Sequence, residues 1–250
     1  MTTAIASYIE ERIRRPAPPN CCIIRHSTPV VSFGDAQQAS IATLGLNPSR
    51  VEFVDDDGVL LINEQRRLAN DVSLKINNLA AAPASVVRQV LEDCNGYFSR
   101  RPYWRWFDQL TPTLAACGAA YRDGSACHLD LVQWATDPTW GNLRPGSLRK
   151  RLVEEDAEFL AQQLRQPNIR LLLVNGRGAI RQLRRSPSID ITLDECKRIN
   201  ESAVQPTVLF SGLVFNRVRV VGWTTNLQSS FGVTDELRRS LLPTAVARLI

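Results

Sequence analysis

The sequence predicts an α/β fold, a three-layer sandwich in which helices flank a central, mostly parallel sheet. Two observations predict it. Short apolar runs, most plainly 169–174, alternate along the chain with longer segments whose apolar residues recur at helical spacing. The runs at 39–46 and 169–174 also end at glycine-containing turn signals. With 250 residues and no Ser/Gly-rich linker, we expect a single domain over 1–250, in which residues 1–20 form an N-terminal helical extension.

Each expected element has a local reason. Apolar residues three and four positions apart predict the helices, and the first helix stops at the prolines of 16–19. The helices are expected at 3–15, 63–77, 83–94, 102–118, 147–165 and 178–185, with a last one from Asp235. Short apolar runs predict the strands, and extended segments at 23–24 and 29–33 lead to the first of them. The strands are expected at 39–46, 126–133, 169–174, 206–211 and 213–222, and the acidic segment 50–62 is expected to be a loop.

Arginine dominates the cations of this basic chain. The formal net charge is +5, the isoelectric point is about 9.1, and of the 30 basic residues only Lys75, Lys150 and Lys197 are lysine. The planar guanidinium group matches phosphate oxygens with two hydrogen bonds, although a genome of high G+C content produces the same bias. The basic residues also cluster, at 100–105, 149–151, 177–185 and 238–239. Clusters on several elements favour a surface that follows a nucleic-acid backbone.

Several other classes of protein are not favoured. No apolar run reaches the roughly 18 residues of a membrane span, and no signal peptide is recognisable. The cysteines form no Cys-x-x-Cys pair, and the only histidines are His26 and His128, so we expect neither a metal site nor another cofactor. We therefore expect a cytoplasmic, monomeric protein that binds no membrane and no metal.

The strongest functional signal follows the first expected strand. There, Gly45-Leu46-Asn47-Pro48-Ser49 ends the apolar run, presents one amide side chain and then stiffens at proline. In open α/β sheets, ligands bind at the carboxyl ends of the strands. Asn47 is therefore expected at the rim of a binding site, although the same five residues also make an ordinary turn.

Four further segments have the same kind of placement, at the ends of expected strands and helices. They are Asn95-Gly96-Tyr97-Phe98 with Arg101-Pro102-Tyr103-Trp104-Arg105, Leu129-Asp130-Leu131-Val132, Val174-Asn175-Gly176-Arg177, and the loop from Gly222 to Ser230. In their order and spacing, the five segments resemble the motifs of the uracil-DNA glycosylase superfamily, in its thymine-DNA and mismatch-uracil branch. The resemblance covers residues 30–240. It implies a monofunctional DNA N-glycosylase, an enzyme that extrudes a nucleotide from DNA and hydrolyses the bond between base and sugar.

The resemblance also implies a role for each matched residue. Asn47 would position the attacking water without acting as a general base, which predicts slow turnover. Asp130 would read the edge of the base, and Asn226 or Thr225 would stabilise the leaving group. The implied base pocket consists of Gly45, Leu46, Pro48, Ser49, Tyr97 and Phe98, with Tyr97 or Phe98 as the stacking face. The implied DNA contacts are Arg101, Arg105, Asn175, Arg177, Thr225, Leu227, Ser229 and Ser230, with Leu227 or Phe231 as the wedge that fills the vacated stack.

Two departures from the family motifs define the expected substrate. Ser49 stands where the branch that excludes thymine has a tyrosine, so the pocket has room for a substituent at C5 of the base. Asp130 stands where a base-reading asparagine is expected, and a carboxylate accepts from the N4 amine of cytosine but opposes O4 of uracil, a discrimination of about 1–3 kcal/mol. Together they predict excision of 5-substituted cytosine. Because removal of plain cytosine would destroy the host genome, we expect foreign DNA as the target, such as phage DNA with glucosylated hydroxymethylcytosine, and a role in anti-phage defence.

Alternatives stay open at this point. A glycosylase of the same fold that repairs mismatched uracil or thymine would have Asp130 turned elsewhere, and a non-catalytic DNA-binding protein would use the same basic surface. Tyr97 and Phe98 equally suit a hydrophobic core. His128 shares a strand face with Asp130 and is expected to be a core histidine.

Overall fold

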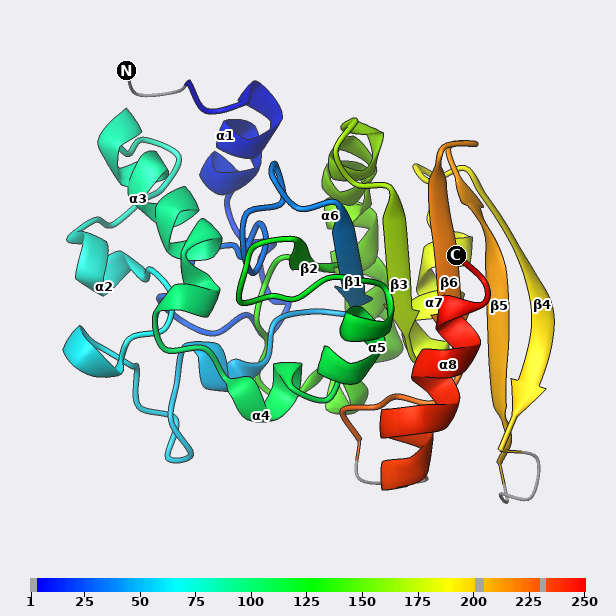
Figure 1. Cartoon of the computed structure of the whole chain (residues 1–250). Helices are drawn as coiled ribbons and strands as arrows, with labels where there is room; N and C mark the ends of the chain where they lie inside the picture. Colours follow the sequence, from blue (N-terminus) through cyan, green and yellow to red (C-terminus); the bar gives the residue numbers. More distant parts are fainter. Residues whose placement is uncertain (1–3, 201–204, 230–232) are drawn as a thin grey trace.

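Six strands form one sheet at the centre of the molecule. They are β1 (Ile41–Gly45), β2 (Ala126–Asp130), β3 (Leu171–Asn175), β4 (Ile191–Ile199), β5 (Thr207–Val214) and β6 (Val218–Trp223). Their order in the sheet is β2-β1-β3-β6-β5-β4 (Figure 1). The first four in this order run parallel, whereas β5 pairs antiparallel with β6 and β4 pairs antiparallel with β5. This computed structural model describes residues 4–200, 205–229 and 233–250.

Helices cover both faces of the sheet (Figure 1). They are α1 (Ser7–Arg14), α2 (Asp71–Leu74), α3 (Ala84–Asn95), α4 (Trp104–Phe107), α5 (Thr111–Ala116), α6 (Gly146–Arg165), α7 (Arg177–Arg185) and α8 (Leu242–Ala247), the last preceded by a π-helical turn at Leu237–Leu241. Leu172 and Val220 pack against α6 and α7 on one face. Their strand neighbours Leu173 and Val221 pack on the other face with side chains from α3, α5 and α8. The predicted fold class, a three-layer α/β sandwich, is confirmed.

Two predicted helices are wrong or incomplete. The segment 63–77 contains only a 3-10 turn (Asn63–Gln65) and α2, because Asn70 caps a new helix and Lys75 ends it in the left-handed conformation. The segment 102–118 is divided into α4 and α5. Pro112 occupies the first turn of α5, where its missing N–H costs nothing.

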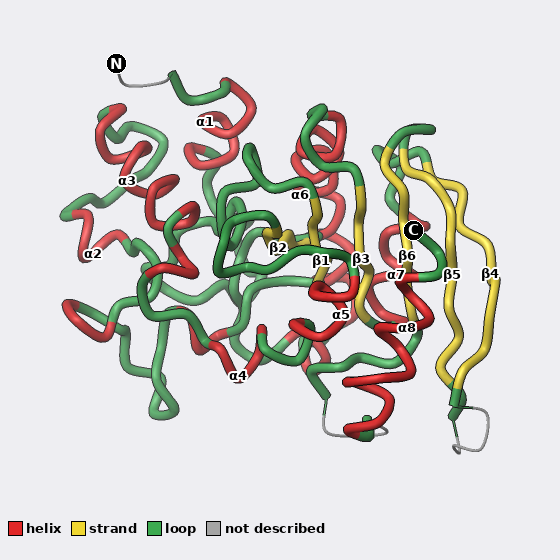
Figure 2. The backbone as a smooth tube through the Cα atoms, viewed as in Figure 1, coloured by secondary structure: helices red, strands yellow, loops and turns green. Residues whose placement is uncertain are grey.

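The prediction also lacked one strand, β4. Figure 2 shows β4 as the outermost strand of the sheet, paired only with β5. Of its nine residues, only Leu193 and Ile199 are buried. The polar run between them carries no apolar alternation, which is the signal from which a half-buried strand is predicted.

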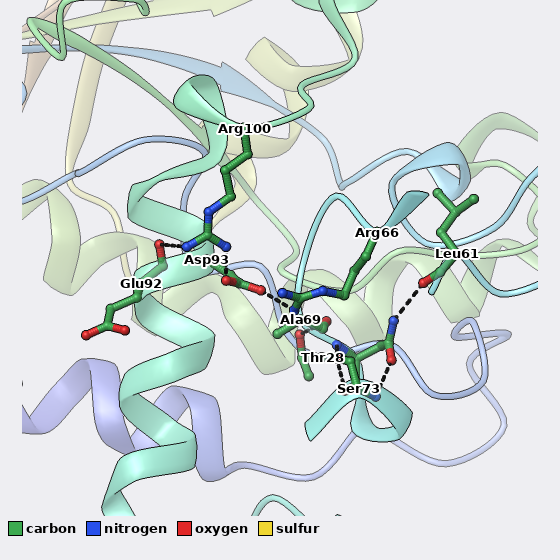
Figure 3. Close-up of polar contacts among 9 residues, drawn as sticks. Thr28, Leu61, Arg66, Ala69, Ser73, Glu92, Asp93 and Arg100 are labelled. Carbon is green, nitrogen blue, oxygen red and sulfur yellow. Dashed lines mark hydrogen bonds and ion pairs between the residues drawn. The ribbon is translucent and has the colours of Figure 1, made fainter. Parts of the chain in front are cut away.

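A polar network fastens the irregular segment around α2 to α3 (Figure 3). The buried carboxylate of Asp93 accepts from the guanidinium groups of Arg66 and Arg100. Nearby, Asn70 Nδ2 donates to the carbonyl of Leu61 at 3.0 Å, and Thr28 Oγ1 donates to the carbonyl of Ala69 at 2.8 Å. Arg100 is therefore a structural cation, and it is not one of the free charges of the basic cluster 100–105.

The order of the strands indicates where a ligand is expected to bind, namely at the carboxyl ends of the parallel strands. The chain leaves β1 toward β2 on one side and leaves β3 toward β4, β5 and β6 on the other. In open α/β sheets, the crevice outside the carboxyl ends of two such strands is where ligands bind. Among the described residues, no helix is long and apolar enough to cross a membrane.

Candidate active site at the carboxyl edge of the sheet

A pocket of about 410 Å³ opens at the carboxyl ends of β1, β2 and β3. It is lined by the segment 45–50 after β1, by His128 and Asp130 of β2, by the loop after β2 and by Asn226 of the loop after β6. The structure thus brings Asn47, Asp130 and Asn226 together, although Asp130 lies 83 positions after Asn47 and Asn226 lies 96 positions after Asp130. Parallel strands end at one edge, so residues that follow different strands meet there.

The carboxamide of Asn47 is held by its nitrogen, and its oxygen has no hydrogen-bond partner among the described residues. Nδ2 donates to the carbonyl of Trp134 and to Oγ1 of Thr136, both at 3.2 Å. The backbone just before it is fixed as well, because Val132 N–H donates to the carbonyl of Leu46 at 3.0 Å. With both amide hydrogens used, Oδ1 is the atom of Asn47 that remains to accept a hydrogen bond from a molecule in the pocket.

Gly45 makes room for the carboxylate of Asp130. The two residues are register partners on β1 and β2. A Cβ atom on Gly45 would lie 2.5 Å from Asp130 Oδ1 and 2.9 Å from Nε2 of His128. The side chains of Asp130 and His128 therefore lie directly over the end of β1, in space that only glycine leaves open at this position.

His128 connects the pocket to a buried chain of hydroxyl groups. Its Nδ1 lies 2.7 Å from Oγ1 of Thr43, which in turn lies 2.6 Å from the hydroxyl of Tyr121, and its Nε2 lies 3.4 Å from Asp130 Oδ1. Burial raises the pKa of Tyr121, whose hydroxyl keeps its proton. We assign the hydrogens of this chain so that Tyr121 donates to Thr43, Thr43 donates to Nδ1, and the ring hydrogen lies on Nε2, which faces Asp130. The expected core histidine is buried, but it also lines the pocket.

Asn175 organises the loop that follows β6. Its Nδ2 donates to Asn226 Oδ1 at 2.8 Å and to Gln228 Oε1 at 2.9 Å, while its Oδ1 accepts from Trp223 Nε1 and from the N–H of Leu227. All four hydrogen-bonding positions of the carboxamide are thus occupied. The expected DNA contact is a positioning residue instead, because no atom of it is left for a phosphate.

The same network orients Asn226. Its Oδ1 accepts from Asn175 and from the N–H of Gln228, at 2.8 and 3.1 Å. Nδ2 consequently remains to donate to a group in the pocket. Thr225, the alternative to Asn226, pairs through Oγ1 with Oγ1 of Thr207 at 2.6 Å and does not line the pocket.

The expected stacking residues Tyr97 and Phe98 lie in the core and do not line the pocket. Tyr97 is completely buried, and both rings pack in a cluster with Phe107. The 3-10 turn Tyr97–Ser99 directs them inward, where they cover the apolar face of the sheet. Trp106 of α4 and Trp140 of the loop after β2 line the pocket instead. The aromatic run 103–107 is evident in the sequence, but the spacing of its residues does not predict that Trp106 is the ring that lines the pocket.

The remaining expected residues have varied positions. Leu46, Pro48 and Ser49 line the pocket, as expected for a base pocket. Leu227 is fully buried, so it is not exposed as a wedge. Ser229 follows Asn226 in the same loop and donates its N–H to the Asn226 carbonyl, whereas Ser230 and Phe231 lie outside the described residues.

The expected cations lie in two hollows beside the pocket. Arg101 and Arg105 line one of about 460 Å³ together with Arg67, whose Nε donates to the carbonyl of Val51. Arg177 lines another, beside α7. Within the part of the chain that the structure describes, no group of three or more His, Cys, Asp or Glu side chains is arranged to hold a metal ion.

Glu52 is a second buried carboxyl group behind the site. Its Oε2 accepts from the hydroxyl of Tyr97 at 2.7 Å, and that hydroxyl oxygen accepts from the N–H of Tyr103. Burial, with a smaller contribution from the charge of Asp130, raises the pKa of Glu52 to about 7 against the opposing effects of the Tyr97 hydrogen bond and of Arg67. Glu52 thus ties the turn after Ser49 to the aromatic cluster, and it changes charge near neutral pH.

No family model matches the chain, and a search of curated proteins finds no match either.

Proposed function

We propose that this protein is a DNA glycosylase that excises a 5-substituted cytosine and leaves an abasic site. One observation carries the proposal: Asn47, Asp130 and Asn226 share a pocket, and each offers it an atom of a different kind. Asn47 offers a carbonyl oxygen, Asp130 a carboxylate and Asn226 an N–H group. Hydrolysis of a base from DNA needs an acceptor for water, a reader for the base edge and a donor to the departing base.

The hydrolytic step assigns a role to each of these atoms. Asn47 Oδ1 accepts from a water molecule and aims its oxygen at C1′ of the extruded nucleotide. The C1′–N1 bond breaks with its electron pair moving to the base, and the water oxygen bonds to C1′. Asn226 Nδ2 donates to O2 of the base, where negative charge develops. The attacking water loses one proton to the solvent and leaves a hydroxyl on C1′. A base that is already protonated at N3 departs neutral, whereas an unprotonated base departs as an anion and takes one proton from the solvent, so that one water molecule is consumed in either case.

Asp130 supports cytosine as the base. Its carboxylate accepts from the N4 amine, and from N3–H when N3 is protonated, whereas it would oppose O4 of uracil. The neighbouring Nε2 of His128, to which the ring hydrogen is assigned, lies 3.4 Å from Oδ1 of this carboxylate. A protonated N3 makes the base a neutral leaving group, so the same contact that selects cytosine also favours its departure.

Other residues of the pocket lining support a bulky polar substituent at C5. Arg50, Thr139 and Trp140 line the pocket together with Gly141. A hydroxyl, a guanidinium and an indole ring suit a sugar, which presents both hydroxyl groups and an apolar face. The volume of about 410 Å³ falls in the range of roughly 300–1,000 Å³ that accommodates ligands larger than a single pyrimidine. Glucosylated hydroxymethylcytosine of phage DNA is such a base, and its removal is a means of anti-phage defence.

An excision assay tests this function. Matched duplex oligonucleotides carry, at one position, cytosine, hydroxymethylcytosine, glucosylated hydroxymethylcytosine, uracil or thymine opposite guanine, and alkali reveals abasic sites. We expect cleavage at the substituted cytosines alone, and none with Asn47→Ala. Asn168→Ala is the matched control, since the amide of Asn168, like that of Asn47, donates to two acceptors, but Asn168 lies before β3, at the opposite end of the parallel strands.

The assay also separates the alternatives. Cleavage at uracil or thymine would support a mismatch glycosylase of base-excision repair and contradict the role given to Asp130. If both the wild type and Asn47→Ala bind DNA and neither produces an abasic site, the result would support a non-catalytic DNA-binding protein.

A further inference from the structure

A basic groove lies beside the pocket, between α7 and the antiparallel strands, and is called the α7 groove. It measures about 370 Å³ and is lined by Arg177, Arg181, Arg184 and Arg185 of α7, facing the paired residues Glu195 of β4 and Phe210 of β5. Arg177, Arg181 and Arg184 or Arg185 follow one another at spacings of three or four residues. They therefore form a row along one side of the helix, one turn or about 5.4 Å apart.

The α7 groove and the pocket share a wall. Asn175, the last residue of β3, lines the pocket, and Arg177, two residues later, lines the groove. The loop after β6 borders both hollows in the same way, because Thr224 lines the groove and Asn226 lines the pocket. Arg177 N–H donates to the carbonyl of Thr224 at 2.9 Å, which joins the two segments. A polymer that has one of its monomers in the pocket can therefore continue directly into the α7 groove.

The charges of the α7 groove are available to an anion. Arg184 is held in place, with its guanidinium over the ring of Phe210 at 4.9 Å and a hydrogen bond to the carbonyl of Leu193. Among the described residues, the side chains of Arg177, Arg181 and Arg185 have no acceptor. Within the described lining of the groove, the one carboxylate is Glu195, and it is engaged by Arg198 at 2.9 Å. The positive charge of the described lining is consequently not compensated.

We propose that the α7 groove binds the sugar-phosphate backbone of the DNA strand whose extruded nucleotide occupies the pocket. The proposal rests on the proposed function. Guanidinium groups one helical turn apart match successive phosphates of a strand that leaves the pocket at the shared wall. The hollow that contains Arg67, Arg101 and Arg105 also contains Asp55 and Asp56, which offset much of its positive charge. The α7 groove is therefore the more basic of the two hollows.

The test measures binding without chemistry. Affinity for an unmodified duplex oligonucleotide is followed by fluorescence anisotropy at several salt concentrations, for the wild type, Arg181→Ala and the double variant Arg177→Ala/Arg181→Ala. Each lost phosphate contact is expected to weaken binding by about threefold to tenfold and to reduce the salt slope by about 0.9. Arg181→Lys, which keeps the charge, is expected to retain most of the affinity.

Arg170→Ala is the matched control. Arg170 is an exposed arginine just before β3, at the edge of the sheet opposite the pocket. Equal affinities and salt slopes for Arg181→Ala, Arg170→Ala and the wild type would overturn the proposal, even if excision is unaffected. Weaker binding by the α7 variants, in a protein that excises no base, would instead support the groove and reject the glycosylase.

Discussion

The amide of Asn175 donates to the side-chain oxygen of Asn226 at 2.8 Å, and this bond determines which end of Asn226 faces the pocket. Asn175 ends β3, in the middle of the parallel part of the sheet, and Asn226 lies in the loop after the neighbouring strand β6. A rigid strand end thus presets the donor that meets the departing base. Such a preorganised donor needs no rearrangement at the moment of bond cleavage.

The first prediction concerns this bond. Asn175→Asp keeps the acceptor for Trp223 and Leu227 but replaces the donor with an oxygen that repels Asn226 Oδ1. We expect excision in single-turnover assays to fall by about 10- to 100-fold, with a loss of unfolding free energy of about 1–3 kcal/mol. Asn168→Asp removes two donors far from the pocket and is expected to lower stability alone. Equal excision rates for the two variants would contradict the positioning role.

Gly45→Ala is expected to displace Asp130. The new Cβ would lie 2.5 Å from Oδ1, and the buried carboxylate must move aside. A shift of about 1 Å in a catalytic group costs roughly 100-fold in rate, so we expect a loss of that order in excision while the protein remains folded. Gly146→Ala is the control, because the nearest atom its Cβ would meet is the flexible end of Arg149 at 3.4 Å. Retained wild-type activity in Gly45→Ala would reject the placement of Asp130.

The hydroxyl of Thr43 is expected to affect the excision rate, because it orients the imidazole of His128. Thr43→Val removes the group that links Tyr121 to Nδ1 of the imidazole. The Nε2–H tautomer is then no longer enforced, and we expect about tenfold slower excision. Thr113→Val is a matched control, since the buried hydroxyl of Thr113 has no partner among the described residues and its removal is expected to be neutral or stabilising. An unchanged excision rate in Thr43→Val would contradict the assigned hydrogen-bond chain.

Glu52 predicts a pH dependence of stability. Its pKa, ordinarily 4.5, is raised to about 7 in the folded protein, first by burial. A carboxyl group with a raised folded-state pKa contributes stability below its unfolded pKa and loses it as the pH rises through the folded value. Relative to Glu52→Gln, the wild type should lose up to about 3 kcal/mol between pH 4.5 and pH 8. Urea unfolding of both proteins across this range measures it, and parallel curves would reject the assignment.

The predictable part of the fold and of the site follows from short-range signals. The parallel strands are apolar runs, and Asn47, Asp130, Asn175 and Asn226 follow such runs. Since parallel strands end together, the sequence predicts a common edge for these residues. The edge strand β4, by contrast, is polar along most of its length, so its pairing with β5 depends on tertiary structure and leaves no periodic signal.

What could not be predicted depends on packing between distant segments. Trp106 and Tyr97 belong to one aromatic-rich stretch, and only the fold determines that Trp106 faces the pocket while Tyr97 faces Glu52. Likewise, an asparagine after a strand can contact a ligand or hold a loop. Four hydrogen bonds occupy the whole carboxamide of Asn175, so this asparagine holds a loop.

The most direct test of the central claim exchanges the residue that reads the base. Wild type and Asp130→Asn are compared on identical duplexes that contain either glucosylated hydroxymethylcytosine or uracil, with Asn47→Ala as the inactive reference. The wild type should excise only the substituted cytosine. Asp130→Asn should lose about 10- to 100-fold on that base and gain activity on uracil, because a carboxamide accepts from N3–H and donates to O4. Unchanged preference for substituted cytosine in Asp130→Asn would contradict the account.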